Sequence, residues 1–276
     1  MILTRSGDGR RVAAVHSAQT SRTVAARAAA TGRGLMGSGT ARAGIGSCRS
    51  AATPAPHSSF NRERTTVKFL VLGATGRTGV LFVQKALDQG HQVTALVRRA
   101  DATVDPRAQV VSGDVTDAAM IAAAARGHDA IISTLGSKNA RQTPTLVTDT
   151  VRAVIASAKT SGVDRFVIVS AFGVGDSLAK ASFLVSPIFR TVLRKTYADK
   201  AASEVLLRAS DLKWTLEYPG ALNNRDSIRY NAVALEDVTK LPIFPSTSRA
   251  NVADFLLHSA VEDTYIRQIA VVTDAR

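Results

Sequence analysis

Three glycines at a fixed spacing, directly after a short apolar run, constrain this chain more than any other feature. Residues 67–72 read Val-Lys-Phe-Leu-Val-Leu, and Gly73, Gly76 and Gly79 follow in the pattern G-x-x-G-x-x-G. An apolar-periodic segment comes next, so the stretch predicts a buried strand, a tight turn and the start of a helix. The first turn of a helix has unpaired backbone N–H groups and a partial positive charge, which suit a pyrophosphate.

This context predicts a dinucleotide site, and the alternative is a tight turn that holds no ligand. Gly73 can adopt the backbone angles of the turn, Gly76 lets the backbone approach the phosphates, and Gly79 lets the helix pack close to the strand. The cofactor contacts that we expect in this turn are Gly73, Thr75, Gly76, Arg77, Thr78 and Gly79.

The first 66 residues differ in composition from the rest of the chain. They contain ten arginines, no lysine and two acidic residues, so they carry much of the formal net charge of +13. The basic balance therefore does not indicate a nucleic-acid-binding surface on the folded part. Arginine- and serine-rich, acid-poor composition is typical of a transit peptide, for the chloroplast stroma or the mitochondrial matrix. The alternative is a misassigned start codon before a cytoplasmic protein, and in both cases we expect a disordered leader.

Several classes of site are not expected in residues 67–276. No run of 18 apolar residues exists, so we expect no membrane span. The only cysteine, Cys48, lies in the leader, which leaves no disulfide and no thiolate metal site in the remainder. The histidines there are scattered, and we expect no metal.

Apolar runs alternate with helical patterns along residues 67–276. This alternation predicts one Rossmann-like α/β domain, with a doubly wound parallel sheet covered by helices on both faces. The expected strands are 68–72, 92–97, 109–112, 130–133, 166–170, 213–218 and 268–272, and the expected helices are 80–89, 117–126, 146–161, 197–210 and 249–262. The segment from Pro219 to Ser248 is polar and reads as irregular. We expect substrate loops at 172–196 and 220–248, because ligands bind beyond strand ends in such sheets.

The end of the second expected strand bears on the choice of cofactor. It reads Leu-Val-Arg-Arg and ends with Arg98 and Arg99. Folds that prefer NAD place a carboxylate there for the ribose hydroxyls, whereas a guanidinium suits a 2′-phosphate. A charge-assisted hydrogen bond contributes roughly 1.5–3 kcal/mol, which is enough to set a preference for NADP(H). Arg77 could add a second contact. The alternative for Arg98 is a solvated strand end.

Several motifs together resemble a known family. They are Gly73–Gly79, Gly113-Asp114-Val115-Thr116-Asp117, Val169-Ser170-Ala171, Asp199-Lys200-Ala201-Ala202-Ser203-Glu204, Leu212–Gly220 and Ser248–Ala253. The chain is similar to short-chain dehydrogenases/reductases, and more narrowly to their atypical NAD(P)H-binding branch. That branch includes NmrA-like proteins and biliverdin-IXβ reductase, which also reduces flavins. Asn251 stands where an aspartate is usual.

The resemblance implies further cofactor contacts. Asp114 and Val115 would flank the adenine, although Asp114 could equally be a turn or helix-capping residue. Thr134, Leu135 and Gly136, just past the fourth expected strand, would line the middle of the cofactor.

The resemblance also implies a catalytic set, with one departure. The superfamily uses a serine at the end of the fifth strand and a tyrosine four residues before a lysine, whose charge lowers the pKa of the tyrosine. Here Ser170 and Lys200 occupy two of these positions, but residue 196 is threonine. Tyr197 is three residues before Lys200, which is still a neighbouring helical spacing, so it is a third candidate catalytic residue that would approach the site at a different angle. Ser170 could instead be a plain strand-end residue, and Lys200 a solvated helix residue.

A tyrosine out of register suits the members that reduce flavin and biliverdin, since these acceptors take their proton from solvent. We therefore expect an NADPH-dependent oxidoreductase that transfers hydride to a planar acceptor such as a flavin, a quinone or a tetrapyrrole. Lys200 would contact the nicotinamide ribose or the substrate. The alternative is an NmrA-like sensor that binds NADP(H) without catalysis. The family contains monomers and homodimers, so both remain open.

Overall fold

The computed structural model describes residues 66–136, 143–174, 194–226, 229–238 and 245–275. All of them belong to one compact unit, residues 60–276. The predicted leader, apart from Thr66, and most of the expected loop at 172–196 lie outside the described residues. Within the described part of the chain, no helix is long and apolar enough to cross a membrane.

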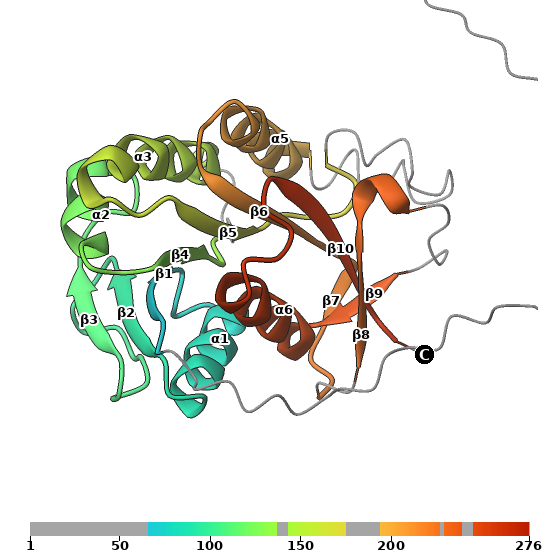
Figure 1. Ribbon diagram of the computed structural model, residues 1–276, viewed down its shortest axis with the longest axis horizontal. Coiled ribbons are helices and arrows are strands. Elements are labelled where there is room, and N and C mark those ends of the chain that lie inside the picture. The colour runs from blue at the N-terminus through green and yellow to red at the C-terminus, as the bar shows by residue number, and fades with distance from the viewer. Residues whose placement is uncertain (1–65, 137–142, 175–193, 227–228, 239–244, 276) are drawn as a thin grey trace, which may run out of the picture. The chain divides into compact units, whose positions relative to one another are not determined.

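A twisted eight-stranded sheet forms the centre of the described structure (Figure 1), with strand order β3-β2-β1-β4-β5-β6-β10-β8. Its strands are β1 (Lys68–Leu72), β2 (Gln92–Val97), β3 (Gln109–Ser112), β4 (Ala130–Ser133), β5 (Arg165–Val169), β6 (Lys213–Pro219), β8 (Tyr230–Ala234) and β10 (Gln268–Asp274). Neighbouring strands are parallel, except that β8 pairs antiparallel with β10 at one edge. The strand order reverses between β1 and β4, which is where such folds bind ligands.

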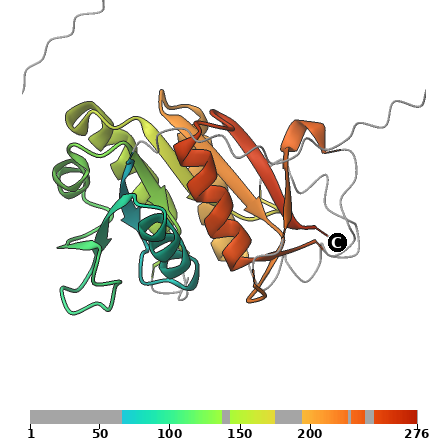
Figure 2. The same cartoon turned by 60° about the horizontal axis from the view of Figure 1, so that its bottom comes forward.

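Helices cover both faces of the sheet, as expected for right-handed crossovers between parallel strands. One face carries α2 (Ala118–Ala125), α3 (Leu146–Ser161) and α5 (Arg194–Arg208), and the other carries α1 (Arg77–Asp88) and α6 (Arg249–Val261). Helices α1 and α6 lie side by side, as Figure 2 shows. The sequence prediction of a doubly wound Rossmann-like domain is therefore confirmed.

Side chains alternate between the two faces along the central strands. Leu70 and Leu72 of β1 pack towards α3, whereas Phe69 and Val71 pack towards α1. All four are fully buried. Because both faces are covered, these strands read as continuous apolar runs in the sequence rather than as alternating ones.

Two expectations need correction. First, α1 begins at Arg77 rather than at residue 80, because the glycine turn leads directly into the helix. Second, the segment from Pro219 to Ser248 is not simply irregular: it contains β7 (Ala221–Asn223), β8, a 3₁₀ turn at Leu235–Asp237 and β9 (Ser246–Ser248). The strands β7 and β9 have three residues each and pair with each other in parallel.

Candidate functional site

The glycine turn between β1 and α1 has the geometry that a cofactor cradle requires. Gly73 has a φ of +88°, which favours glycine, and its carbonyl oxygen accepts a hydrogen bond from the Gly76 N–H at 2.9 Å. A Cβ on Gly79 would lie 2.2 Å from that same oxygen. No other residue type fits at this position, so the close approach of the helix to the turn depends on Gly79.

The N-terminus of α1 differs from three other helix starts in how it is capped. Its N-cap is Gly76, which supplies no side-chain acceptor, and its first turn contains no acidic residue. By contrast, Asp117 caps α2, Ser248 caps α6, and Asp199 accepts hydrogen bonds from the first-turn N–H groups of α3. A helix start without a side-chain cap presents N–H groups to an anion, so the turn fits a pyrophosphate.

The end of β4 lies against this turn, as expected for residues that line the middle of the cofactor. The Thr134 hydroxyl donates a hydrogen bond to the Gly73 carbonyl at 3.1 Å, and the Thr134 N–H donates to the Leu72 carbonyl at 2.9 Å. A Cβ on Gly73 would also approach Leu135. Gly136 is the last described residue of this segment. Thr134 and Leu135 therefore form one wall of the turn.

The residues expected around the adenine and its ribose lie on the neighbouring strand ends. Arg98 follows β2 and is exposed. Asp114 accepts hydrogen bonds from the Thr116 N–H at 2.9 Å and the Thr116 hydroxyl at 2.8 Å. These bonds, and to a smaller extent the charge of Arg98, lower the pKa of Asp114. Asp114 thus has the turn role that was its alternative, while Val115 is 4% exposed and packs into the core.

At the other end of the site, a buried carboxylate joins the expected serine to a residue that sequence reasoning missed. Glu204 of α5 accepts a hydrogen bond from the Ser170 hydroxyl and one from the Tyr218 hydroxyl, both at 2.6 Å. Burial raises the pKa of Glu204, although these bonds act against the shift. Arg208, one helical turn further along α5, lies 3.5 Å from the same carboxylate. Ser170 is therefore fixed by the interior of the protein.

Lys200 is also buried beside the end of β5. Its ammonium group donates a hydrogen bond to the Val169 carbonyl at 3.0 Å, and the residue is 7% exposed. Burial lowers the pKa of Lys200 to about 8, while the charges of Glu204, Asp199 and Glu217 act in the opposite direction. The alternative of a solvated helix lysine is therefore wrong, and the structure brings Lys200 and Ser170 to the same strand end.

Glu217 of β6 is a second buried carboxyl group near this end. It is 0% exposed, and neither of its carboxyl oxygens has a hydrogen-bond partner among the described residues. Burial raises the pKa of Glu217 well above its usual range, and the charge of Lys200 acts against this shift. Sequence reasoning did not assign a role to Glu217. The run Trp-Thr-Leu-Glu-Tyr could have indicated it, because a charged residue inside an apolar strand is unusual.

Tyr197 lies over the loop that follows β5. Its hydroxyl donates a hydrogen bond to the Phe172 carbonyl at 3.3 Å, and burial raises its pKa. A tyrosine that acts as an acid near neutral pH needs a lowered pKa, normally from an adjacent lysine. The direction found for Tyr197 is the opposite, so its assignment as a proton donor gains no support.

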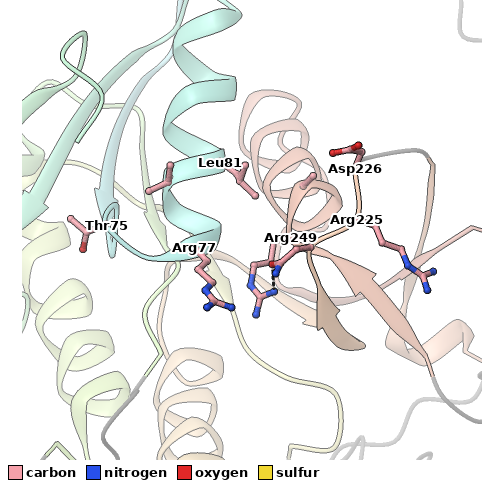
Figure 3. A pocket seen from close by; sticks show the side chains of 9 residues that line it. Thr75, Arg77, Leu81, Arg225, Asp226 and Arg249 are labelled. Carbon is pink, nitrogen blue, oxygen red and sulfur yellow. Dashed lines mark hydrogen bonds between the residues drawn. The ribbon is translucent and has the colours of Figure 1, made fainter. Parts of the chain in front are cut away.

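A cavity of about 440 Å³ opens beside the glycine turn (Figure 3), between the first turns of α1 and α6. Thr75 and Arg77 line it from the turn, and Arg249 lines it from α6. Sequence reasoning did not assign a role to Arg249. Its position directly after the N-cap Ser248 was the available signal, since first-turn side chains lie at the mouth of a helix.

Comparisons with known proteins agree with this geometry. A model of the NAD(P)H-binding family matches residues 73–263. An uncharacterised chloroplastic protein of Arabidopsis thaliana is 32% identical over 170 residues, which cover 58% of this chain and 60% of that protein. The chain thus spans less than two thirds of that relative. YhfK of Bacillus subtilis, described as an uncharacterised sugar epimerase, is 31% identical over 166 residues, or 57% of this chain and 73% of YhfK.

A solved structure supports the same assignment. ChuY, an anaerobilin reductase from Escherichia coli O157:H7, superposes with a TM-score of 0.62 at 25% identity, over 75% of this chain and 97% of ChuY. The match of the family model begins at Gly73, the first glycine of the cradle, and extends beyond α6. The motifs, the fold and the family model lead to one conclusion: the chain belongs to the NAD(P)H-binding family, in agreement with its resemblance to atypical short-chain dehydrogenases/reductases.

Proposed function

We propose that the protein is an NADPH-dependent reductase that transfers hydride to a planar acceptor such as a flavin, a quinone or a tetrapyrrole. One observation carries the proposal: the glycine cradle and the buried Ser170–Lys200 pair lie at the same edge of the sheet, at the ends of strands β1, β4 and β5. A nicotinamide cofactor supplies a hydride, and an acceptor at this edge would receive it. The anaerobilin reductase ChuY supports a tetrapyrrole as one candidate class.

Arg98 supports NADPH as the cofactor in preference to NADH. It is exposed at the end of β2, and its charge makes a small contribution to the lowered pKa of Asp114. A guanidinium in this place can bind a 2′-phosphate through two parallel hydrogen bonds. Arg77 remains a candidate second contact, although it also lines the cavity beside α6.

In this proposal, the side chains at the acceptor end position the cofactor and the acceptor and do not exchange protons with them. Ser170 already donates its single proton to Glu204, so it can accept a hydrogen bond but cannot donate one while Glu204 is ionised. Lys200 keeps its charge at neutral pH and has further N–H donors beside the Val169 carbonyl. It can hold a ribose hydroxyl or an acceptor oxygen, and the proton that completes reduction comes from solvent.

Cofactor preference gives the first test. Replacing Arg98 with alanine should raise the Kd for NADPH about ten- to hundredfold, the loss expected for a charge-assisted hydrogen bond, and should leave the Kd for NADH nearly unchanged. Arg126, an exposed arginine at the end of α2, provides the matched control. Equal affinities of the original protein for NADPH and NADH would contradict the assignment of Arg98.

Turnover gives the second test. The full chain is mixed with NADPH and a panel of flavins, quinones and linear tetrapyrroles, and the nicotinamide absorbance is followed. We expect NADPH consumption with at least one acceptor. Tight NADPH binding without consumption would favour the alternative, an NADP(H) sensor. One observation favours that alternative: the hydroxyls of Ser170 and Tyr197 both donate to acceptors within the protein.

We also propose that residues 1–66 direct the chain to a plastid. The arginine-rich, acid-poor composition supports this, as does the chloroplastic relative from Arabidopsis. A fusion of residues 1–66 to a fluorescent protein should enter chloroplasts in a plant cell, and the same fusion with its arginines changed to glutamine should not. A mitochondrial or cytoplasmic signal would contradict the proposal.

A further inference from the structure

The cavity between α1 and α6 has an unusual concentration of positive charge. Arg77, Arg225 and Arg249 line it, against a single acidic residue, Asp226. Figure 3 shows the guanidinium groups of Arg77 and Arg249 pointing the same way from neighbouring helices. Like charges side by side repel each other unless an anion lies between them. The arrangement therefore favours a negatively charged occupant.

The side-chain hydrogen bonds of Arg249 go to neutral acceptors. Arg249 donates to the Asn223 carbonyl at 3.2 Å and to the Asn224 side-chain oxygen at 2.6 Å. Within the described residues, neither it nor Arg77 nor Arg225 has an ion pair with a carboxylate. A guanidinium has five N–H donors, so Arg249 keeps donors for a ligand while its asparagine contacts hold it in place. Fixed guanidinium groups suit carboxylate and phosphate groups, which they can bind in a bidentate manner.

The cavity also has an apolar wall. Val80 of α1 is 47% exposed, which is high for a large aliphatic side chain, and Leu81 and Ala250 lie beside it in the lining. An inorganic anion would gain nothing from this surface. A ligand with an apolar body and an anionic substituent would cover the wall and neutralise the arginines at the same time.

The position of the cavity connects it to the proposed acceptor end. The Ser170 N–H donates to the Glu217 carbonyl, and the Phe172 N–H donates to the Pro219 carbonyl, so the end of β6 lies beside Ser170. From Pro219 the chain continues directly through β7 (Ala221–Asn223) to Asn224 and Arg225, which line the cavity. One short segment of chain therefore joins the proposed acceptor end to the cavity wall.

We propose that this cavity binds the anionic substituent of the acceptor, a phosphate or a carboxylate. The inference rests on the proposed reductase function and narrows its substrate class to planar acceptors that carry such a group. It favours flavin mononucleotide over riboflavin, and tetrapyrroles with free propionates over their methyl esters. Arg225 and Arg249 determine this specificity, and Arg77 lines the same cavity from the glycine turn.

The phosphates of the cofactor are a second possible source of the anion, because Thr75 and Arg77 belong to both the glycine turn and the cavity wall. The two sources predict different results. If the acceptor supplies the anion, substitution of Arg225 or Arg249 changes recognition of flavin mononucleotide and leaves riboflavin and NADPH largely unaffected. If NADPH supplies it, the KM for NADPH changes and both flavins respond alike.

The experiment compares the two flavins as acceptors for the full chain and for its Arg225→Ala and Arg249→Gln variants, with Arg126→Ala as the control. We expect the original protein to prefer flavin mononucleotide over riboflavin. Each cavity variant should raise the KM for flavin mononucleotide about tenfold or more, and should change the KM values for riboflavin and NADPH by less than about threefold. Arg225 is exposed on a loop, so its replacement should leave the fold intact even if Arg249→Gln does not.

A binding measurement separates failure of this inference from failure of the reductase proposal. Quenching of flavin fluorescence is titrated with protein saturated with NADP⁺. Tighter binding of flavin mononucleotide than of riboflavin, lost in Arg225→Ala, would support the anion site even without turnover, and only the reductase proposal would then fail. Equal binding of both flavins, equal losses for both in the variants, or a change confined to NADPH would overturn the inference.

Discussion

The two ends of the candidate site are built by different means. At the cofactor end, backbone atoms form the site: a left-handed Gly73, a helix start without a side-chain cap and a Gly79 that tolerates no Cβ. At the acceptor end, buried side chains form it, with Glu204 fixing Ser170 and Tyr218 while Lys200 lies against β5. A backbone site recognises groups that every dinucleotide has, whereas a side-chain site can change its specificity by single substitutions.

The largest expected effect tests the backbone end. Gly79→Ala places a methyl group 2.2 Å from the Gly73 carbonyl oxygen, so α1 must move away from the turn. We expect NADPH binding, measured by calorimetry, to be lost. Gly136→Ala is the control for folding, because a Cβ there meets no atom of the described residues within 4 Å. This variant should unfold at the same denaturant concentration as the original protein. Undiminished NADPH affinity in Gly79→Ala would show that the close approach is not needed.

The next effect tests the side-chain end. Glu204→Ala leaves the Ser170 and Tyr218 hydroxyls without their acceptor inside the protein, and each unsatisfied buried group costs about 1–3 kcal/mol. We expect the free energy of unfolding, from urea denaturation, to fall by about 2 kcal/mol or more. NADPH affinity should change much less than stability does.

A conservative comparison isolates the charge of Glu204. Glu204→Gln retains one acceptor oxygen, so it should lose less stability than Glu204→Ala. If the alanine variant were as stable as the original protein, the network would contribute nothing and the contrast between the two ends would fail.

A third prediction concerns pH. Burial lowers the pKa of Lys200 to about 8, so its charge is present below that pH and is lost above it. If Lys200 binds the cofactor ribose or the acceptor as a cation, kcat/KM should fall about tenfold per pH unit above 8. Lys200→Arg keeps its charge and should remove this decline.

The pH dependence of the free energy of unfolding gives an independent measure of the ionisation of Lys200. Between pH 8 and the ordinary lysine pKa of 10.5, the unfolded state binds a proton that the folded state does not. The contribution of Lys200 to the free energy of unfolding should therefore rise with pH over this interval. A decline in activity that persisted in Lys200→Arg would have to come from another group.

The smallest effect returns to the cofactor end. Thr134→Val removes the hydroxyl that donates to the Gly73 carbonyl, a neutral hydrogen bond worth roughly 0.5–1.5 kcal/mol. We expect a decrease of about 1 kcal/mol in the free energy of unfolding, smaller than that for Glu204→Ala. A larger loss than in Glu204→Ala would reverse the proposed contrast between backbone and side-chain construction.

The same contrast explains how much the sequence could predict. Buried parallel strands such as β1 and β4 are apolar without interruption, and a glycine cradle has a fixed spacing, so both were predictable from local patterns. The Glu204–Tyr218 contact was not, because it depends on which face of β6 meets α5. Arg249 and Asn224 likewise form a hydrogen bond across 25 residues of sequence, which no local pattern reveals, and the antiparallel edge strand β8 is a run of only five residues within a segment that reads as polar.

Asp274, the last residue of β10, helps to hold the wall of the cavity, although it is distant in sequence from the residues that line it. Its carboxylate accepts hydrogen bonds from the side chains of Asn223, Ser246 and Asn251 and from the Ser248 N–H, at 2.7–3.3 Å. It thereby joins β7, β9 and the start of α6, the elements that hold Arg249 in place. The hydrogen bonds of the glycine turn do not involve Asp274. Loss of this one carboxylate would therefore loosen the wall that carries Arg249 while the cofactor cradle keeps its own hydrogen bonds.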